Sequence, residues 1–206
     1  MRRVSDRLAS AVQEAFARRR EPGRAVATDA DRVARACYEM AVRFHRGGRL
    51  FVFGTGAPST DAQHVSVEFV HPVIVGKRAL PAISLTNDIA TVTGVAGREG
   101  FEEIFAHQLR QLAGPDDIAL GVSGDGRDPS VVRGLAAARE LGLLTVALTG
   151  GDGGEVAGSG ADHVLEVASD DPRVVKEVQV TVYHVLWELV HVLFEQPGVL
   201  EPEVIR

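Results

Sequence analysis

Short apolar segments alternate with helical segments along most of the chain, and this alternation limits the possible folds more than any other feature of the sequence. Strands are predicted at residues 50–53, 80–85, 118–122, 143–148 and 163–167. Helices are predicted up to residue 70, near 88–94 and 99–112, over 133–142, and from 172 to about 194. Because helices separate the apolar strands, we expect a parallel sheet covered on both faces, with ligands bound at the carboxyl ends of its strands.

Two further helices are predicted before the first strand. They cover about residues 4–20 and 27–46 and are separated by Arg20-Glu21-Pro22-Gly23, with Thr28 or Asp29 as a cap for the second. They either pack in an oligomer or cover one edge of the sheet. The 206 residues suit a single domain, in which residues 1–47 are the N-terminal helices and residues 48–206 form the α/β core.

Charge and cysteine content narrow the function. The net charge is −6, which argues against nonspecific binding to nucleic acid or to a membrane surface. No segment has the length and apolarity of a membrane span or a signal peptide. Cys37 is the only cysteine, so an intrachain disulfide and a cysteine-based zinc site are both excluded. We therefore expect a cytoplasmic protein.

Two loops that follow strands are rich in glycine and polar residues. Residues 54–61, GTGAPSTD, are not a dinucleotide fingerprint, because Ser59 stands where the third glycine is needed. This loop either binds a small anion or is a plain turn that Ser59 or Thr60 caps. Residues 123–129, SGDGRDP, expose backbone donors, but Asp125 and Asp128 would repel a phosphate. The alternative is a turn in which Asp128 caps the next helix.

Two helices carry polar residues at helical spacing. Asp61, His64, Glu68 and His71 are spaced by three, four and three, so they share one face. His64 and Glu68 can reach one metal ion, although an ordinary solvated stripe has the same spacing. The last helix carries a second stripe, which either faces solvent or a subunit or lines an enclosed polar site: Arg173, Glu177, Thr181, His184, Glu188 and His191.

Five collinear segments give the chain a family resemblance. They are GTGAPSTDAQHVSVEFV, SLTNDIATVTGVAGREGFEEIFAHQL, DIALGVSGDGRDPSVVRGLAAARELG, TVALTGGDGGEVAG and KEVQVTVYHVLWELV. They resemble successive segments of the bacterial phosphoheptose isomerases, which belong to the sugar-isomerase (SIS) superfamily. The resemblance implies a doubly wound parallel sheet, a flavodoxin-like three-layer sandwich with two extra N-terminal helices. It also implies a homotetramer that interconverts sedoheptulose 7-phosphate and glycero-manno-heptose 7-phosphate, with zinc in the site.

The same resemblance assigns roles to individual residues. His64, Glu68 and His184 match the metal ligands, and Glu68 and His184 match the acid/base pair that moves a proton between C1 and C2 through an enediol. Carboxylate, imidazole and metal suit that chemistry. The substrate-binding residues are expected to be Thr55, Gly56, Ala57, Ser59, Asp61, Arg98, Ser123, Gly124, Asp125, Asp128 and Lys176.

The chain also departs from the family pattern. Asp125 and Asp128 stand where the family has phosphate-binding hydroxyls. Gly97-Arg98 stands where the family has an Asn-Asp pair that contacts the substrate. Lys176 replaces a glutamine that helps to bind metal and substrate. The departures leave two other hypotheses open. One is a noncatalytic regulatory or binding protein, similar to the SIS-fold relative that associates with the bacterial replication initiator. The other is a module that senses a sugar phosphate.

Overall fold

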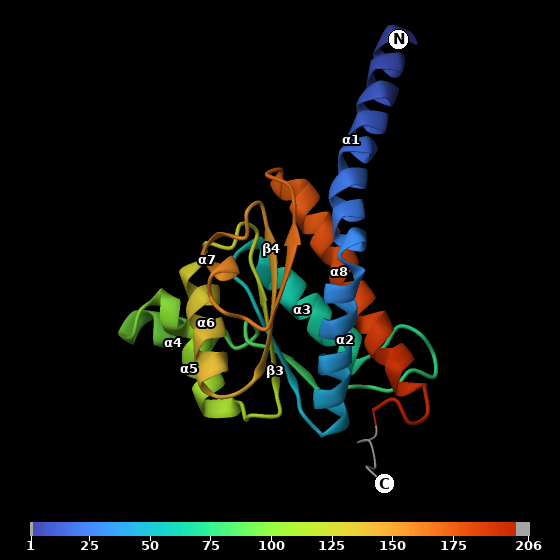
Figure 1. The fold of residues 1–206 in the computed structure, drawn as a ribbon. Coiled ribbons are helices and arrows are strands. Elements are labelled where there is room, and N and C mark those ends of the chain that lie inside the picture. Colours follow the sequence, from blue (N-terminus) through green and yellow to red (C-terminus); the bar gives the residue numbers. More distant parts are fainter. Residues whose placement is uncertain (1, 201–206) are drawn as a thin grey trace.

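Five parallel strands form one sheet at the centre of the molecule, in the order β2-β1-β3-β4-β5. The computed structural model describes residues 2–200 (Figure 1). This strand order is that of a doubly wound fold, in which the chain reverses direction across the sheet between β1 and β3. The predicted fold is thereby confirmed. The strands are β1 Leu50–Phe53, β2 Ala82–Ser84, β3 Ile118–Val122, β4 Leu144–Gly150 and β5 His163–Val167.

Helices cover both faces of the sheet and make three layers (Figure 1). Helices α1, α2, α3 and α8 lie on one side, and α4, α5, α6 and α7 lie on the other. They are α1 Arg2–Thr28, α2 Ala30–His45, α3 Ala57–Val70, α4 Ile89–Arg98, α5 Ile104–Leu112, α6 Pro129–Glu140, α7 Gly154–Ala157 and α8 Pro172–Phe194, with a 3₁₀ turn at Phe101–Glu103.

The central strands are apolar throughout because both of their faces are buried. Every residue of β1, β3 and β4 is buried. In β1, Leu50 and Val52 pack into the core under α2, α3 and α8, whereas Phe51 and Phe53 pack into the core under α5 and α6. This alternation follows from the two-residue period of a strand. It fixes which helices share a face, and so which side chains can meet.

The N-terminal helices differ from the prediction. Helix α1 continues through Pro22 to Thr28, and the break before α2 falls at Asp29 instead of residues 20–23. A proline inside a helix removes one backbone hydrogen bond, but contacts on both sides of Pro22 hold this helix against α8. Arg19 pairs with Glu177, and Val26 packs on the core. Helix α2 adds six buried residues to that core, and Asp29 makes no side-chain cap.

Strand β4 and the segment that follows it also differ from the prediction. Strand β4 runs to Gly150, two residues beyond the predicted end at Leu148. In the glycine-rich segment after it, where no helix was predicted, residues 154–157 form the single-turn helix α7. Its start is held by the Gly126 carbonyl, which accepts a hydrogen bond from the Val156 amide at 3.0 Å. Such tertiary contacts have no local signal in the sequence.

Within residues 2–200, no helix combines the length and apolarity that a membrane crossing requires.

The position of Pro22 gives a test of the fold. We expect Pro22→Ala to stabilise the protein by up to about 3 kcal/mol, because alanine restores a helical N–H and removes the clash of the ring. Pro129→Ala is the matched control. Pro129 stands at the start of α6, where the missing N–H has no partner in the helix, so its loss should cost at most about 1 kcal/mol. Urea unfolding measures both changes. An unchanged or lower stability of Pro22→Ala would contradict a continuous α1.

Candidate active site

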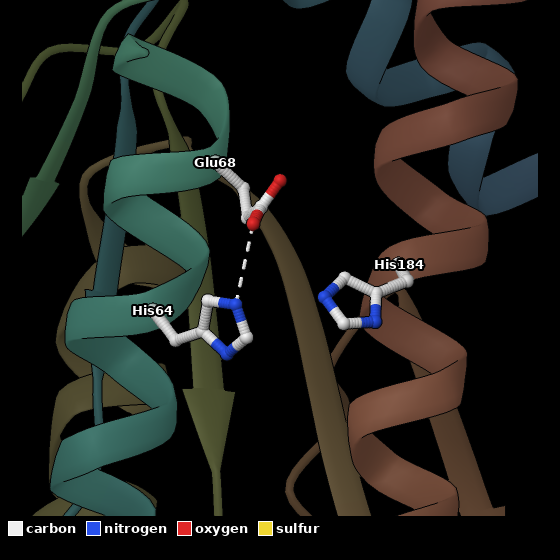
Figure 2. Close-up of side chains that lie close together, drawn as sticks. All are labelled: His64, Glu68 and His184. Carbon is white, nitrogen blue, oxygen red and sulfur yellow. Dashed lines mark hydrogen bonds and ion pairs between the residues drawn. The ribbon is translucent and has the colours of Figure 1, made fainter. Parts of the chain in front are cut away.

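Helix α3 places two functional groups side by side. His64 and Glu68 are four residues apart, so their side chains leave the helix on the same face. Nε2 of His64 lies 3.2 Å from Oε1 of Glu68, and the second carboxylate oxygen points away from the imidazole (Figure 2). One oxygen of Glu68 is therefore oriented by its neighbour, while the other is available to a ligand or a proton.

Helix α8 supplies a third group from a distant part of the sequence. The imidazole of His184 faces the α3 pair across the space between the two helices (Figure 2). The ring centroids of His64 and His184 are 5.1 Å apart, and the planes meet at 79°. One ligand atom from each of His64, Glu68 and His184 lies within 4.8 Å of the other two. The structure thus brings together the three residues that the sequence assigned to one centre.

The donor types of the three residues fit a zinc ion, and so does the spacing of His64 and Glu68. Two imidazoles and one carboxylate are a common protein ligand set for zinc. Ligand atoms about 2.0–2.1 Å from a tetrahedral ion lie roughly 3.4 Å from one another, close to the 3.2 Å between His64 and Glu68. The Glu68 side chain is 11% exposed and that of His64 is 42% exposed. The carboxylate is therefore sheltered, while the imidazole side remains open to a small molecule.

The loop between β1 and α3 is shaped by close packing. A Cβ atom on Gly54 would lie 2.6 Å from the carbonyl oxygen of Val122 and 2.8 Å from Cβ of Pro58, so only glycine fits there. Helix α3 begins at Ala57, with Gly56 as its N-terminal boundary. The alternative of a cap by Ser59 or Thr60 is wrong. Their hydroxyls donate to the Gly56 and Ala57 carbonyls instead.

Lys176 points at α3 and not at open solvent. Its Nζ atom donates to Oδ2 of Asp61 at 2.7 Å and to the Ala57 carbonyl at 3.3 Å. The Asp61 side chain is 5% exposed, and that of Lys176 is 41% exposed. A buried carboxylate requires such a partner. Asp61 and Lys176 therefore form an ion pair on the same two helices that carry the His64, Glu68 and His184 cluster.

Two aromatic residues of α8 also contact the cluster, and neither was predicted. The Tyr183 hydroxyl lies 2.9 Å from Nδ1 of His64, and the Trp187 indole N–H donates to the Glu68 carbonyl at 2.8 Å. Their spacing of four residues, with His184 between them, was a usable signal. Neither residue was assigned a role from the sequence, because aromatic residues on a buried helix are most often core.

The loop after β3 is held by its own acidic residues. Asp128 caps α6, accepting hydrogen bonds from the amides of Ser130 at 2.9 Å and Val131 at 3.4 Å, which confirms that alternative of the sequence analysis. It also accepts a hydrogen bond from the Thr55 hydroxyl. The Ser123 hydroxyl, which was expected to bind substrate, accepts from the Gly126 amide at 3.0 Å. Three groups predicted to bind substrate, on Thr55, Ser123 and Asp128, are therefore engaged in hydrogen bonds within the loops.

A pocket of about 420 Å³ opens between these loops. Arg127 is the cation in its lining, but its Nη2 atom donates to both carboxylate oxygens of Asp152 at 2.8 Å, and its Nη1 atom donates to the Asp125 carbonyl at 3.1 Å. This pairing raises the pKa of Arg127 and lowers the pKa of Asp152. A smaller hollow of about 150 Å³ adjoins the pocket at Thr55 and includes Gly54, Gly56 and Ser59. The full lining of the larger pocket is Thr55, Phe101, Glu102, Asp125, Arg127, Asp128, Pro129 and Ser130.

Several predicted residues lie apart from these groups. Arg98 is exposed on the last turn of α4, Gly124 is exposed in its loop, and His71 is exposed just beyond α3. The polar stripe predicted on α8 also divides. His191 is buried, with its ring nitrogens 2.8 Å from the Trp187 carbonyl and 2.9 Å from the Arg78 carbonyl. A helix that packs against neighbours on several sides does not present one continuous polar face.

Comparisons with known proteins agree with this architecture. A sequence profile of the SIS domain family matches residues 17–150. A phosphoheptose isomerase of Solidesulfovibrio magneticus is 39% identical over 196 residues, which covers 95% of this chain and 94% of the relative. One of Nitratidesulfovibrio vulgaris (strain Miyazaki F) is 39% identical over 175 residues, or 84% of each chain. The structure of a phosphoheptose isomerase from Francisella tularensis superposes with a TM-score of 0.83 at 28% identity, covering 89% of this chain and 97% of that one.

The two acids of the β3–α6 loop should behave differently when they are removed. We expect Asp128→Ala to destabilise the protein by about 1–2 kcal/mol, because it removes the α6 cap and the Thr55 contact. Asp125→Ala is the control. Its carboxylate is exposed and accepts only a local bond from the Arg127 amide, so its removal should cost less than about 0.5 kcal/mol. Urea unfolding compares them. Equal losses would show that Asp128 has no special structural role.

Proposed function

Because the chain belongs to the phosphoheptose isomerase family of SIS domain proteins, we propose that it is an aldose–ketose isomerase for a phosphorylated sugar. The relatives support a phosphosugar isomerase. We propose sedoheptulose 7-phosphate as the ketose and glycero-manno-heptose 7-phosphate as the aldose. The observation that carries this proposal is the meeting of His64 and Glu68 on α3 with His184 on α8.

The proposed chemistry assigns one proton transfer to each group. The Glu68 carboxylate takes the proton from C1 of the ketose and returns it to C2, and the imidazole of His184 moves a proton between O2 and O1. An enediol connects ketose and aldose, and the atoms balance because the reaction only relocates two hydrogens. Glu68 suits the carbon-bound proton since its second oxygen is not held by His64 (Figure 2).

His64, Glu68 and His184 are also the residues that would hold a zinc ion. When bound, zinc would polarise the oxygens at C1 and C2 as a Lewis acid. The residues themselves orient the sugar and exchange its protons. The sheltered position of Glu68 strengthens its electrostatic interactions, because less water screens them.

We call the pocket of about 420 Å³ between the loops after β1 and β3 the loop pocket, and we propose that it binds the phosphorylated end of the sugar. It lies at the carboxyl ends of β1 and β3, where doubly wound folds bind ligands. Its lining contains Arg127 but also Glu102, Asp125 and Asp128. This excess of acidic groups is the observation that favours the second candidate, a noncatalytic SIS-fold binding protein.

We further propose a cytoplasmic homotetramer without nucleic-acid partners. Exposed apolar side chains follow one face of α1 at intervals of four residues, namely Leu8, Val12 and Phe16. An apolar groove of about 460 Å³ lies between α1, α2 and α8. Both support packing between copies of the chain. Cys37 is free and buried, and burial raises its pKa to about 12, which is consistent with a thiol that takes no part in redox chemistry.

Turnover of sedoheptulose 7-phosphate tests the proposed reaction. We expect the purified protein, supplied with zinc, to form the aldose, and Glu68→Gln to lower kcat at least about 100-fold, because the amide cannot accept the carbon-bound proton. His71→Gln is the matched control, since His71 is an exposed residue at the end of the same helix and should leave kcat unchanged.

Two results would contradict this proposal. The first is the absence of turnover with every sugar phosphate offered, which would favour the binding protein. The second is undiminished turnover by Glu68→Gln. Measuring KM for sedoheptulose and for sedoheptulose 7-phosphate tests the role of the loop pocket separately. If the pocket binds the phosphate, KM should be lower for the phosphorylated sugar.

A further inference from the structure

The imidazole of His64 has hydrogen-bond partners at both nitrogens. Nε2 faces Glu68, and Nδ1 lies 2.9 Å from the hydroxyl of Tyr183. The rings of His64 and Tyr183 meet edge to face, with centroids 5.5 Å apart and planes at 78°. The phenol is therefore placed to fix the rotation of the imidazole about its side chain. Tyr183 is buried, so little water is available to replace it.

Tyr183 in turn faces a carboxylate. Burial raises the pKa of the Tyr183 hydroxyl, and the nearby charge of Asp61 raises it further. Asp61 is itself held by Lys176 at 2.7 Å. Lys176, Asp61, Tyr183 and His64 therefore form a chain of neighbouring polar groups, in which hydrogen bonds join Lys176 to Asp61 and Tyr183 to Nδ1 of His64.

A hydroxyl group suits the middle of this chain because it can donate and accept. Without a cation, Nε2–H of His64 can donate to Glu68 while the Tyr183 hydroxyl donates to Nδ1. A cation ligated by Nε2 requires the proton to be on Nδ1 instead. Nδ1–H then donates to the Tyr183 oxygen, and the Tyr183 hydroxyl donates to Asp61. The Tyr183 hydroxyl has one hydrogen, which is directed to Nδ1 in the first state and to Asp61 in the second.

We propose that Tyr183 and Asp61 are positioning residues for His64, which hold its ring and stabilise the tautomer whose Nε2 lone pair faces Glu68 and His184. Histidine ligands commonly donate their other N–H to a carboxylate or carbonyl. In this protein the carboxylate of Asp61 acts through the phenol of Tyr183. The proposal rests on the metal centre of the proposed function and extends it to Tyr183, which contacts His64, and to Asp61, which lies one turn before His64 on α3.

Zinc affinity of Tyr183→Phe tests this role without any measurement of activity. Competition with a chromophoric chelator gives the dissociation constant. We expect zinc to bind 10–100-fold more weakly, as is typical when an outer partner of a ligand is lost. Phenylalanine keeps the aromatic ring, whose centroid lies 4.9 Å from that of the His184 ring. The metal-free variant should therefore retain the melting temperature of the parent. Tyr38→Phe is the control, because Tyr38 is exposed on α2 and should leave the affinity unchanged.

A double-mutant cycle tests whether Asp61 acts through Tyr183. Asp61→Asn should weaken zinc binding in the parent but add little in the Tyr183→Phe background, because the chain of hydrogen bonds is already broken there. The visible absorption spectrum of the cobalt-loaded proteins gives a second readout. It should change in Tyr183→Phe and in Asp61→Asn but not in Tyr38→Phe.

The outcomes separate this proposal from the proposed function. Parental zinc affinity in Tyr183→Phe, together with weaker binding by His64→Ala, overturns the positioning role and leaves the metal centre intact. Additive losses in the cycle overturn the path from Asp61 through Tyr183. A parent protein that binds no zinc overturns the metal centre and this proposal together.

Discussion

Helices α3 and α8 lie on the same face of the sheet, and the register between them decides which polar side chains meet. Three contacts fix that register. Lys176 pairs with Asp61, Tyr183 contacts His64, and Trp187 donates to the carbonyl of Glu68. Each contact involves a residue further along both helices than the last. The three contacts hold His184 opposite the two functional groups of α3, so the geometry of the site is a consequence of helix packing (Figure 2).

The sheet makes that packing possible. Parallel strands with fully buried faces need helices on both sides, and the order β2-β1-β3-β4-β5 places α3 and α8 together. The loops after β1 and β3 then meet at one edge, where Gly54 allows the backbone of β3 to approach closely. The fold therefore forms two groups of polar residues, a cluster between helices and a pocket between loops. In the loop pocket, the pairing of Arg127 with Asp152 and the capping by Asp128 leave few free groups.

Much of this arrangement could be predicted from the sequence, for identifiable reasons. The apolar strands and the spacing of His64 and Glu68 are periodic features, and both depend only on local geometry. Family resemblance was needed to bring in His184, since no spacing rule connects α3 with α8. Tyr183 was not identified as a site residue, because a tyrosine on an apolar helix is most often part of the core. The end of α1 was predicted wrongly at Pro22, because contacts with α8 outweigh the tendency of proline to end a helix.

We propose that His64, Glu68 and His184 form a zinc centre in the native protein. Anomalous X-ray diffraction on either side of the zinc absorption edge, from crystals of protein purified with zinc, tests it most directly. We predict one strong peak per chain, within bonding distance of His64 Nε2, a Glu68 carboxylate oxygen and a nitrogen of His184. A map without a peak among these three residues, from protein shown to be folded and supplied with zinc, would contradict the claim.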